Sequence, residues 1–137
     1  MATRSNIGIL NSDGTVAYIY CHFDGYLEHN GKILAEHYTT EAKVRELIML
    51  GDLSILGPEI GKKQDFNGTR NKQWCLAYGR DRGESGTGAC TCSYEDYAKN
   101  EFEEYTYLFT PGKGWEVRVY NNEFWANLND ILSHITI

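Results

Sequence analysis

The sequence predicts a single α+β domain over residues 1–137, with a mostly antiparallel sheet of about five or six strands and three or four short helices. The length of 137 residues suits one ordinary domain. Aromatic residues make up 13% of the chain, and aromatic side chains favour strands. Segments with apolar–polar alternation are interspersed with segments of helical spacing, as expected when strands and helices are mixed. A content of 42% hydrophobic and 23% charged residues excludes a disordered or fibrous chain.

A β-hairpin is predicted at the start of the chain. Residues 4–10 and 15–23 are strand-like, and residues 11–14 between them contain an Asp-Gly step that suits a tight turn. Side chains alternate between the two faces of a strand. We therefore expect Cys21 to face a core and His22 to face the opposite side.

Two helices are expected next. The two Gly residues of residues 24–31 interrupt the strand pattern, and residues 32–38 then show helical spacing. Thr40 is a suitable N-cap for a second helix that Gly51 ends. A single further helical turn is expected within residues 52–57, before a Gly-Pro step.

The middle of the chain is expected to be mostly irregular. Residues 61–72 lack an apolar period and indicate a surface loop. Residues 72–78 resemble a third strand. Residues 79–88 contain four Gly, which disfavours any regular structure there.

The last third predicts two helices and a second hairpin. Ser93 and Asp96 form a capping box at the start of a short acidic helix that runs to about Phe102. Residues 104–109 and 115–120 flank a Pro-Gly turn and predict paired strands. Asn127 then caps a final helix whose apolar stripe ends at Ile135.

The charge balance narrows the classes of partner. Nineteen acidic against thirteen basic side chains give a net charge of −6, which argues against direct nucleic-acid binding. No apolar run reaches the roughly 18 residues of a membrane span, and residues 1–6 have no signal-peptide pattern. We therefore expect a cytoplasmic protein that contacts neither nucleic acid nor membrane.

The cysteines suggest a structural zinc site. Alternate residues of an extended segment project to one side, and the Gly-rich loop could return the chain to the preceding strand. A tetrahedral site needs four ligands, and His22 is an alternative fourth ligand. Inert buried thiols and disulfides remain open alternatives. The four candidate ligands are Cys21, Cys75, Cys90 and Cys92.

A second candidate site combines two loops. Four residues lie close together in sequence: His22, Asp24, Glu28 and His29. They could supply an acid and a base or bind a divalent ion, although no complete catalytic motif accompanies them. The absence of such a motif favours a non-enzymatic protein. Turn-forming hydrogen bonds are the alternative explanation of this cluster.

A basic stretch that runs into the Gly-rich loop contributes to this second site. Residues 62–82 carry six basic and two acidic side chains, a net charge of +4, which suits a small phosphorylated ligand. A solvated loop with local pairing of Asp81 to arginine is the alternative. The proposed nucleotide pocket consists of His22, Asp24, His29, Arg80, Arg82 and Glu84.

An acidic segment is the third candidate. Residues 93–104 have a net charge of −4, and such a surface can accelerate encounter with a basic groove on a nucleic-acid-handling protein. Aromatic side chains supply contact area at low entropic cost. The alternative is a solvated helix face. The candidate partner-binding residues are Glu95, Asp96, Glu101, Glu103, Glu104, Tyr94 and Tyr97.

Several sequence blocks together resemble a family of small proteins encoded by tailed bacteriophages and prophages. These blocks are ATRSNIGI at residues 2–9, YCHFDGYLEHNG at 20–31, LGDL at 50–53, LGPEIG at 56–61 and YGRDRGE at 78–84. The similarity spans nearly the whole chain, whereas the Cys90-Thr91-Cys92 element departs from the family pattern.

The resemblance implies a role in infection. Small accessory phage proteins are often antagonists of host defence, and we expect a non-enzymatic inhibitor whose partner is a host defence protein such as a Cas nuclease. The alternative from another class is a protein that sequesters or cleaves a nucleotide signal. A virion or morphogenesis accessory is a third possibility.

Overall fold

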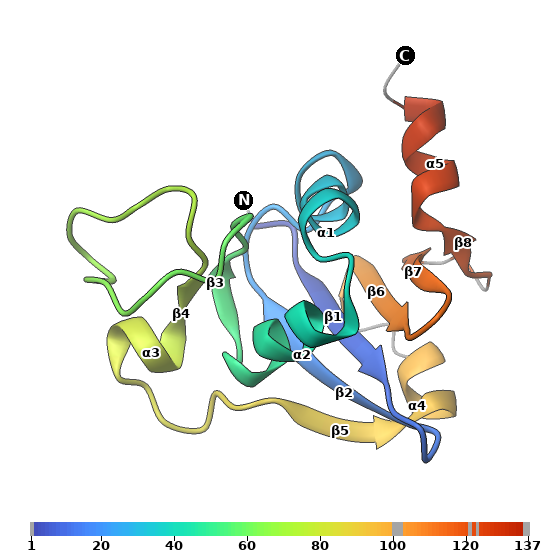
Figure 1. Ribbon diagram of the computed structural model, residues 1–137, viewed down its shortest axis with the longest axis horizontal. Coiled ribbons are helices and arrows are strands. Elements are labelled where there is room, and N and C mark those ends of the chain that lie inside the picture. Colours follow the sequence, from blue (N-terminus) through green and yellow to red (C-terminus); the bar gives the residue numbers. More distant parts are fainter. Residues whose placement is uncertain (1, 100–102, 121, 123, 136–137) are drawn as a thin grey trace.

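The computed structural model describes residues 2–99, 103–120, 122 and 124–135, which form one α+β domain with a single mixed sheet (Figure 1). The described strands are β1 (Ser5–Leu10), β2 (Thr15–Cys21), β3 (Leu53–Ile55), β4 (Leu76–Ala77), β5 (Cys90–Ser93), β6 (Tyr105–Thr110), β7 (Gly114–Val119) and β8 (Ala126–Asn127). The described helices are the π-helical turn η1 (Leu27–Gly31), α1 (Lys32–His37), α2 (Glu41–Met49), α3 (Tyr78–Arg82), α4 (Tyr94–Ala98) and α5 (Leu128–Ile135).

The sheet is built around the pair β1–β2. Its strand order is β4-β3-β2-β1-β6-β7-β8, with β1–β6 and β2–β3 parallel and the other pairs antiparallel. β5 pairs antiparallel with residues 15–18 of β2, and β3 pairs with the same strand at Cys21. One edge of β2 is therefore shared by two short strands.

Elements with strong local signals form as predicted. The first hairpin places Leu10 opposite Val16, and the second pairs β6 with β7. The Thr40 side chain accepts a hydrogen bond from the Lys43 backbone N–H at 3.2 Å and so caps α2. The Ser93 hydroxyl accepts the Asp96 N–H at 3.1 Å and caps α4.

Other elements differ from the sequence-based expectation. The turn expected within residues 52–57 is instead β3, and the strand expected over 72–78 shortens to β4. The Gly-rich segment 79–88 begins within α3, and β5 and β8 were not predicted. The three strands β3, β4 and β8 span only two or three residues each, so a hydrophobic period cannot reveal them; pairing with a neighbouring strand defines them.

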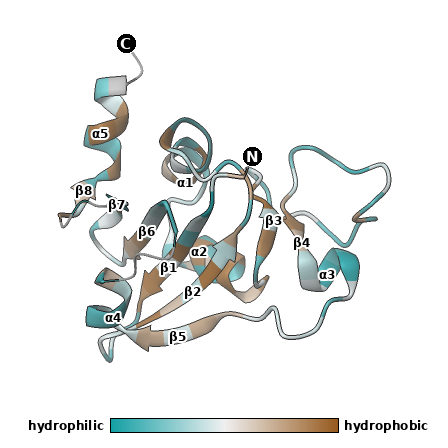
Figure 2. Cartoon of the chain, turned by 180° about the vertical axis from the view of Figure 1, so that it is seen from behind, coloured by the Kyte–Doolittle hydropathy of each residue, from teal (hydrophilic) through white to brown (hydrophobic). Residues whose placement is uncertain are grey.

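Helices cover the two faces of the sheet unequally. α1, α2 and α5 bury apolar side chains on one face, in a cluster that includes Ile7, Ile19 and Leu47. α2 lies in front of β1 and β2 in Figure 1 and behind them in Figure 2. Among the described helices, none is both long and apolar enough to cross a membrane.

The opposite face carries a smaller core under α4. Val16, Tyr97 and Leu108 are its buried members, each at most 1% exposed. The Tyr97 hydroxyl donates to the Tyr107 carbonyl oxygen at 2.6 Å and passes directly over Gly8. A Cβ atom at Gly8 would lie 2.8 Å from both the Tyr97 hydroxyl oxygen and a Val16 methyl carbon. Gly8 therefore sets how closely α4 approaches the sheet.

Replacement of Gly8 by alanine is expected to lower the free energy of unfolding by about 1–3 kcal/mol, because the added methyl group overpacks this core. Gly88→Ala is the matched control, since a Cβ atom there meets nothing within 4 Å. Urea unfolding followed by circular dichroism measures both changes. Equal stability of the two variants would contradict the close approach at Gly8.

Candidate functional site

The four cysteines do not converge. Cys21 and Cys75 lie in the larger core, both 0% exposed. Cys90 and Cys92 on β5 pair opposite Tyr18 and Val16, so their side chains lie on the face of the smaller core. The described part of the chain contains no group of three or more His, Cys, Asp or Glu residues that could hold a metal ion. The predicted zinc ligands are thus separated by the sheet itself.

The two buried thiols belong to the hydrophobic core. Burial raises the pKa of Cys21 to about 12 and also raises the pKa of Cys75. The Cys75 sulfur accepts the Gly57 backbone N–H at 3.3 Å and lies 3.4 Å from the Tyr38 hydroxyl. Neither thiol is poised to form a thiolate at neutral pH.

Thiol labelling is expected to distinguish the exposed cysteine from the others. In native protein, Cys90 should react rapidly with Ellman's reagent because it is exposed, Cys92 more slowly, and the two core thiols only after unfolding. Cys90→Ser should remove the rapid phase, and all four thiols should react in denaturant as the control. Four slow thiols that become reactive only with a chelator would instead indicate a metal site.

The histidine loop is held by several separate contacts. The Tyr20 hydroxyl and His22 Nδ1 lie 2.6 Å apart, whereas His29 Nδ1 lies 2.9 Å from the Asn30 side-chain oxygen. Asp24 adopts a positive φ of 58°, and its backbone carbonyl accepts the Asn30 N–H at 3.2 Å. The Asn30 side chain bonds within the turn region as the turn-forming interpretation expects, whereas Asp24 contributes through its backbone carbonyl.

Arg80 is committed to the fold. Its guanidinium donates to Asp81 at 2.9 Å and to the backbone carbonyls of Ile60 and Cys75 at 2.8 Å each. The Asp81 carboxylate also accepts the backbone N–H groups of Ala77 and Gln64. The pairing of arginine with Asp81 is therefore found, but with the Asp81 side chain buried in α3 rather than in a solvated loop. Arg80 has little capacity left for an external anion.

Arg82 and Glu84 line a pocket of about 370 Å³. They pair with each other at 2.5 Å, and the Arg82 guanidinium also lies 4.7 Å from the Phe66 ring centroid and 4.8 Å from that of Tyr78. Sequence reasoning missed the other lining residues, although the alternation of β2 places Tyr20 on the same face as His22. The complete lining is Tyr20, Asp52, Tyr78, Arg82, Glu84, Ser85, Gly86 and Thr87.

This pocket is poorly suited to phosphate. The Arg82 charge is offset by Glu84, and Asp52 adds a carboxylate that forms no ion pair within the described chain. Burial raises the pKa of Asp52, the Tyr20 backbone N–H lowers it, and Glu84 raises it further. Of the six residues of the predicted nucleotide pocket, only Arg82 and Glu84 line this cavity, and His22 reaches its wall through Tyr20.

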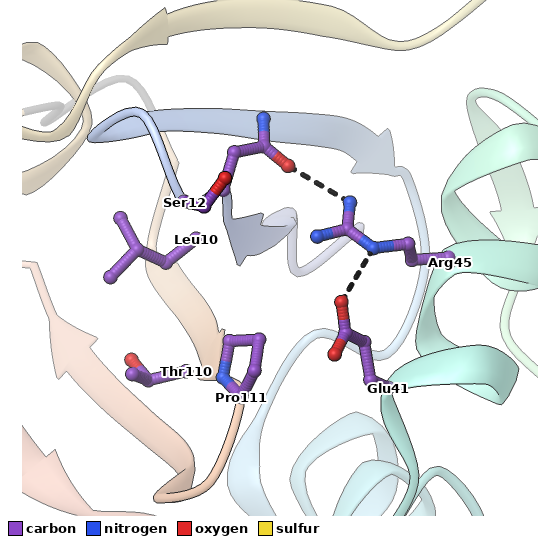
Figure 3. Close-up of a pocket in the computed structure, with 7 residues that line it drawn as sticks. Leu10, Ser12, Glu41, Arg45, Thr110 and Pro111 are labelled. Atoms are coloured by element: carbon purple, nitrogen blue, oxygen red, sulfur yellow. Dashed lines mark hydrogen bonds and ion pairs between the residues drawn. The ribbon is translucent and has the colours of Figure 1, made fainter.

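Another pocket, of about 420 Å³, lies between α2 and the two hairpin turns (Figure 3). Arg45 donates to Glu41 at 3.0 Å and to the Asn11 side-chain oxygen at 2.8 Å. Thr110 and Pro111 line the other side. The charged groups of this pocket pair with each other, and Arg45 links α2 to the first hairpin. None of the predicted site residues in the described part of the chain lines the pocket.

The acidic segment is largely solvent-exposed. Glu95, Asp96 and Glu104 are exposed, and Glu103 is partly buried. None of these carboxylates forms an ion pair with another described residue. Burial raises the pKa of Glu103 while the nearby Arg4 lowers it, so its charge is partly compensated. Glu101 lies outside the described residues.

The aromatic part of this prediction needs correction. Tyr97 is 0% exposed and faces the smaller core, because helical spacing turns it toward the sheet, so a partner cannot contact it. Tyr94 is 37% exposed at the start of the same helix. Two further aromatic side chains are exposed. The Tyr120 backbone N–H donates to the Glu104 carbonyl oxygen. Phe124 precedes Trp125, whose ring stacks on Tyr97. We define the acidic–aromatic surface as Tyr94, Glu95, Asp96, Glu103, Glu104, Tyr120 and Phe124.

Comparison of the chain with family models, curated proteins and solved structures finds no match. The buried thiols and Arg80 stabilise the fold, whereas the side chains of the acidic–aromatic surface leave charge and apolar area exposed.

Proposed function

We propose that this chain is a phage-encoded accessory protein that acts in the host cytoplasm and antagonises a host defence system by binding a basic protein surface, with a Cas nuclease as the first target to test. The observation that carries the proposal is the acidic–aromatic surface, in which the exposed carboxylates of Glu95, Asp96 and Glu104 form no ion pair with another described residue. The net charge of −6 adds a long-range attraction to basic proteins.

Physical reasons favour a protein partner over a small ligand. Tyr120 is 50% exposed and Phe124 is 74% exposed, and aromatic side chains of this kind are enriched at interfaces. The nearby carboxylates can pair with the lysine and arginine residues that line nucleic-acid grooves. A protein bound in such a groove excludes nucleic acid without any bond-breaking chemistry of its own.

The decisive experiment compares two isosteric triple variants. Glu95→Gln, Asp96→Asn and Glu104→Gln together change the net charge from −6 to −3 and neutralise the surface. The matched control, Glu28→Gln, Glu36→Gln and Glu46→Gln, makes the same charge change at exposed positions on other elements. We expect the first variant to bind a sensitive nuclease at least about tenfold more weakly, because it removes charges that face the partner, and the control to bind nearly normally.

Salt provides a second measurement. Association with the nuclease should slow as ionic strength rises, because salt screens attraction between exposed charges. Isothermal titration and stopped-flow kinetics report affinity and association rate. Unchanged nuclease activity with the protein in large molar excess, across a panel of Cas nucleases, would discard the nuclease as target, and equal binding by both triple variants would discard the surface.

The nucleotide-signal alternative receives less support. Arg80 is engaged with Asp81 and two carbonyl groups, and the cavity at Arg82 contains an additional carboxylate from Asp52. A phosphorylated ligand would meet net negative charge there. Binding of a basic protein surface is therefore better supported than binding of a nucleotide signal.

A further inference from the structure

β5 has a free edge that faces solvent. Within the described residues, β5 pairs only with β2, so its second edge carries unpaired backbone N–H and C=O groups. Cys90, Thr91 and Ser93 are all exposed. A strand edge of this kind is a template to which another extended segment can add by backbone hydrogen bonds.

This edge lacks the charged residues, proline and β-bulge that commonly block pairing. Natural edge strands are commonly blocked by lysine, proline or a β-bulge. Residues 85–94 contain no charged residue and no proline, and the register with β2 runs without interruption from Tyr18↔Cys90 to Thr15↔Ser93. Figure 2 shows brown tones along β5 beside the teal of α4. The edge is therefore open to a further strand.

An apolar pocket adjoins this edge. Its volume is about 350 Å³, and Ala17, Ile48, Met49 and Ala89 form its apolar wall. Arg45, which pairs with Glu41, is the remaining lining residue. Met49 is 87% exposed and therefore offers apolar area to a bound segment. Thr91 pairs with Ala17 and so projects on the same side of the sheet as this pocket. An apolar side chain of an added strand would project beside Met49.

Charge favours one kind of occupant. Ser93 ends β5 and caps α4, so the exposed Glu95 and Asp96 follow the strand directly. An antiparallel strand added to β5 would begin beside Ser93, and basic residues preceding it would meet these carboxylates. A second copy of this chain brings the same net charge of −6 and is repelled.

We propose that the free edge of β5 receives an extended segment of the partner protein, antiparallel to β5, with basic residues immediately before the strand and an apolar residue beside Met49. This inference rests on the proposed function and adds the mode of recognition. Backbone hydrogen bonds would supply affinity, while the pocket and the carboxylates would select the sequence.

A peptide titration tests the proposal without the natural partner. The probe is the synthetic peptide acetyl-Lys-Arg-Lys-Thr-Val-Thr-Val-Thr-amide, added to isotopically labelled protein and followed by NMR. We expect backbone amide shifts and slower hydrogen exchange at residues 90–93. Moving the basic residues to the end of the peptide should weaken binding, and replacing both valines with proline should abolish it.

Protein variants separate the edge from general charge effects. Thr91→Lys should weaken peptide binding at least about tenfold, because an edge lysine blocks strand addition. Thr39→Lys changes the charge identically at an exposed position outside the strands and should bind normally. Met49→Ser should weaken binding of the valine peptide but not of a peptide with serine in place of valine.

The possible outcomes separate the two proposals. Binding that spares residues 90–93, or that survives the proline replacements, overturns strand addition. Amide shifts at residues 90–93 that grow with protein concentration alone assign the edge to a second copy and overturn the proposed occupant. Peptide binding at β5 together with an absence of any nuclease partner supports the edge and discards only the nuclease target.

Discussion

Asp81→Ala is expected to destabilise the domain by about 3–5 kcal/mol, the range for removing one partner of a buried ion pair. The Asp81 side chain is 0% exposed, and that of Arg80 is 16% exposed. Removal of the carboxylate leaves the Arg80 guanidinium without its counter-charge and the N–H groups of Ala77 and Gln64 without an acceptor. Because these groups join α3, β4 and the loop that contains Gln64, the whole region should loosen.

The pH dependence of this effect has a definite sign. Burial opposes the charged form of Asp81, but hydrogen bonds from Arg80, Ala77 and Gln64 outweigh it and lower the pKa of the carboxyl group. The stabilisation is therefore complete above the unfolded-state pKa of roughly 3.9 and is lost as the pH falls through the lower folded-state value. The difference in free energy of unfolding between wild type and Asp81→Asn should therefore shrink as the pH falls through this range.

Urea unfolding at neutral pH and across the acid range measures both expectations. Asp130→Asn serves as a control because Asp130 is exposed. An Asp81→Ala variant as stable as this control would show that the buried pair adds nothing to stability. A stability difference between wild type and Asp81→Asn that stays constant as the pH falls below about 4 would contradict the lowered pKa.

The sequence predicted those parts of the fold that depend on local signals. The side chains of Thr40 and Ser93 each accept a hydrogen bond from the backbone N–H three residues later, so the starts of α2 and α4 were predictable. Arg80 shows the opposite case. Its acceptors include the Ile60 carbonyl, twenty residues away, so its structural role depends on how the 61–72 loop packs against α3. A basic side chain in a Gly-rich segment carries no local sign of such burial.

The candidate sites illustrate the same limit. Alternation along β2 predicted that Cys21 faces a core, which is confirmed. It could not predict the face on which Cys90 and Cys92 lie, because that depends on the register between β5 and β2. The free edge of β5 also depends on this pairing and could not be predicted from the sequence.

Tyr97→Ala is expected to destabilise the protein by about 3–5 kcal/mol, the usual range for truncating a large buried aromatic side chain. The Tyr97 ring lies 5.4 Å from the Tyr18 ring and stacks on Trp125 at 6.4 Å, and these contacts fill the space above Gly8. Tyr97→Phe should lower the free energy of unfolding by about 1 kcal/mol, since it removes only the hydrogen bond to the Tyr107 carbonyl oxygen.

Tyr97→Ala should also weaken partner binding by more than its lower stability alone would explain. Tyr97 holds α4 against the sheet, so its truncation should release Glu95 and Asp96 from their fixed positions and weaken partner binding in protein that remains folded. Leu47→Ala is the matched control, because Leu47 is equally buried beneath α2 on the opposite face. Both variants are compared by titration at a temperature where circular dichroism shows native structure. Equal weakening by the two would mean that partner binding follows overall stability, whereas selective weakening by Tyr97→Ala identifies Tyr97 as the residue that positions the acidic surface.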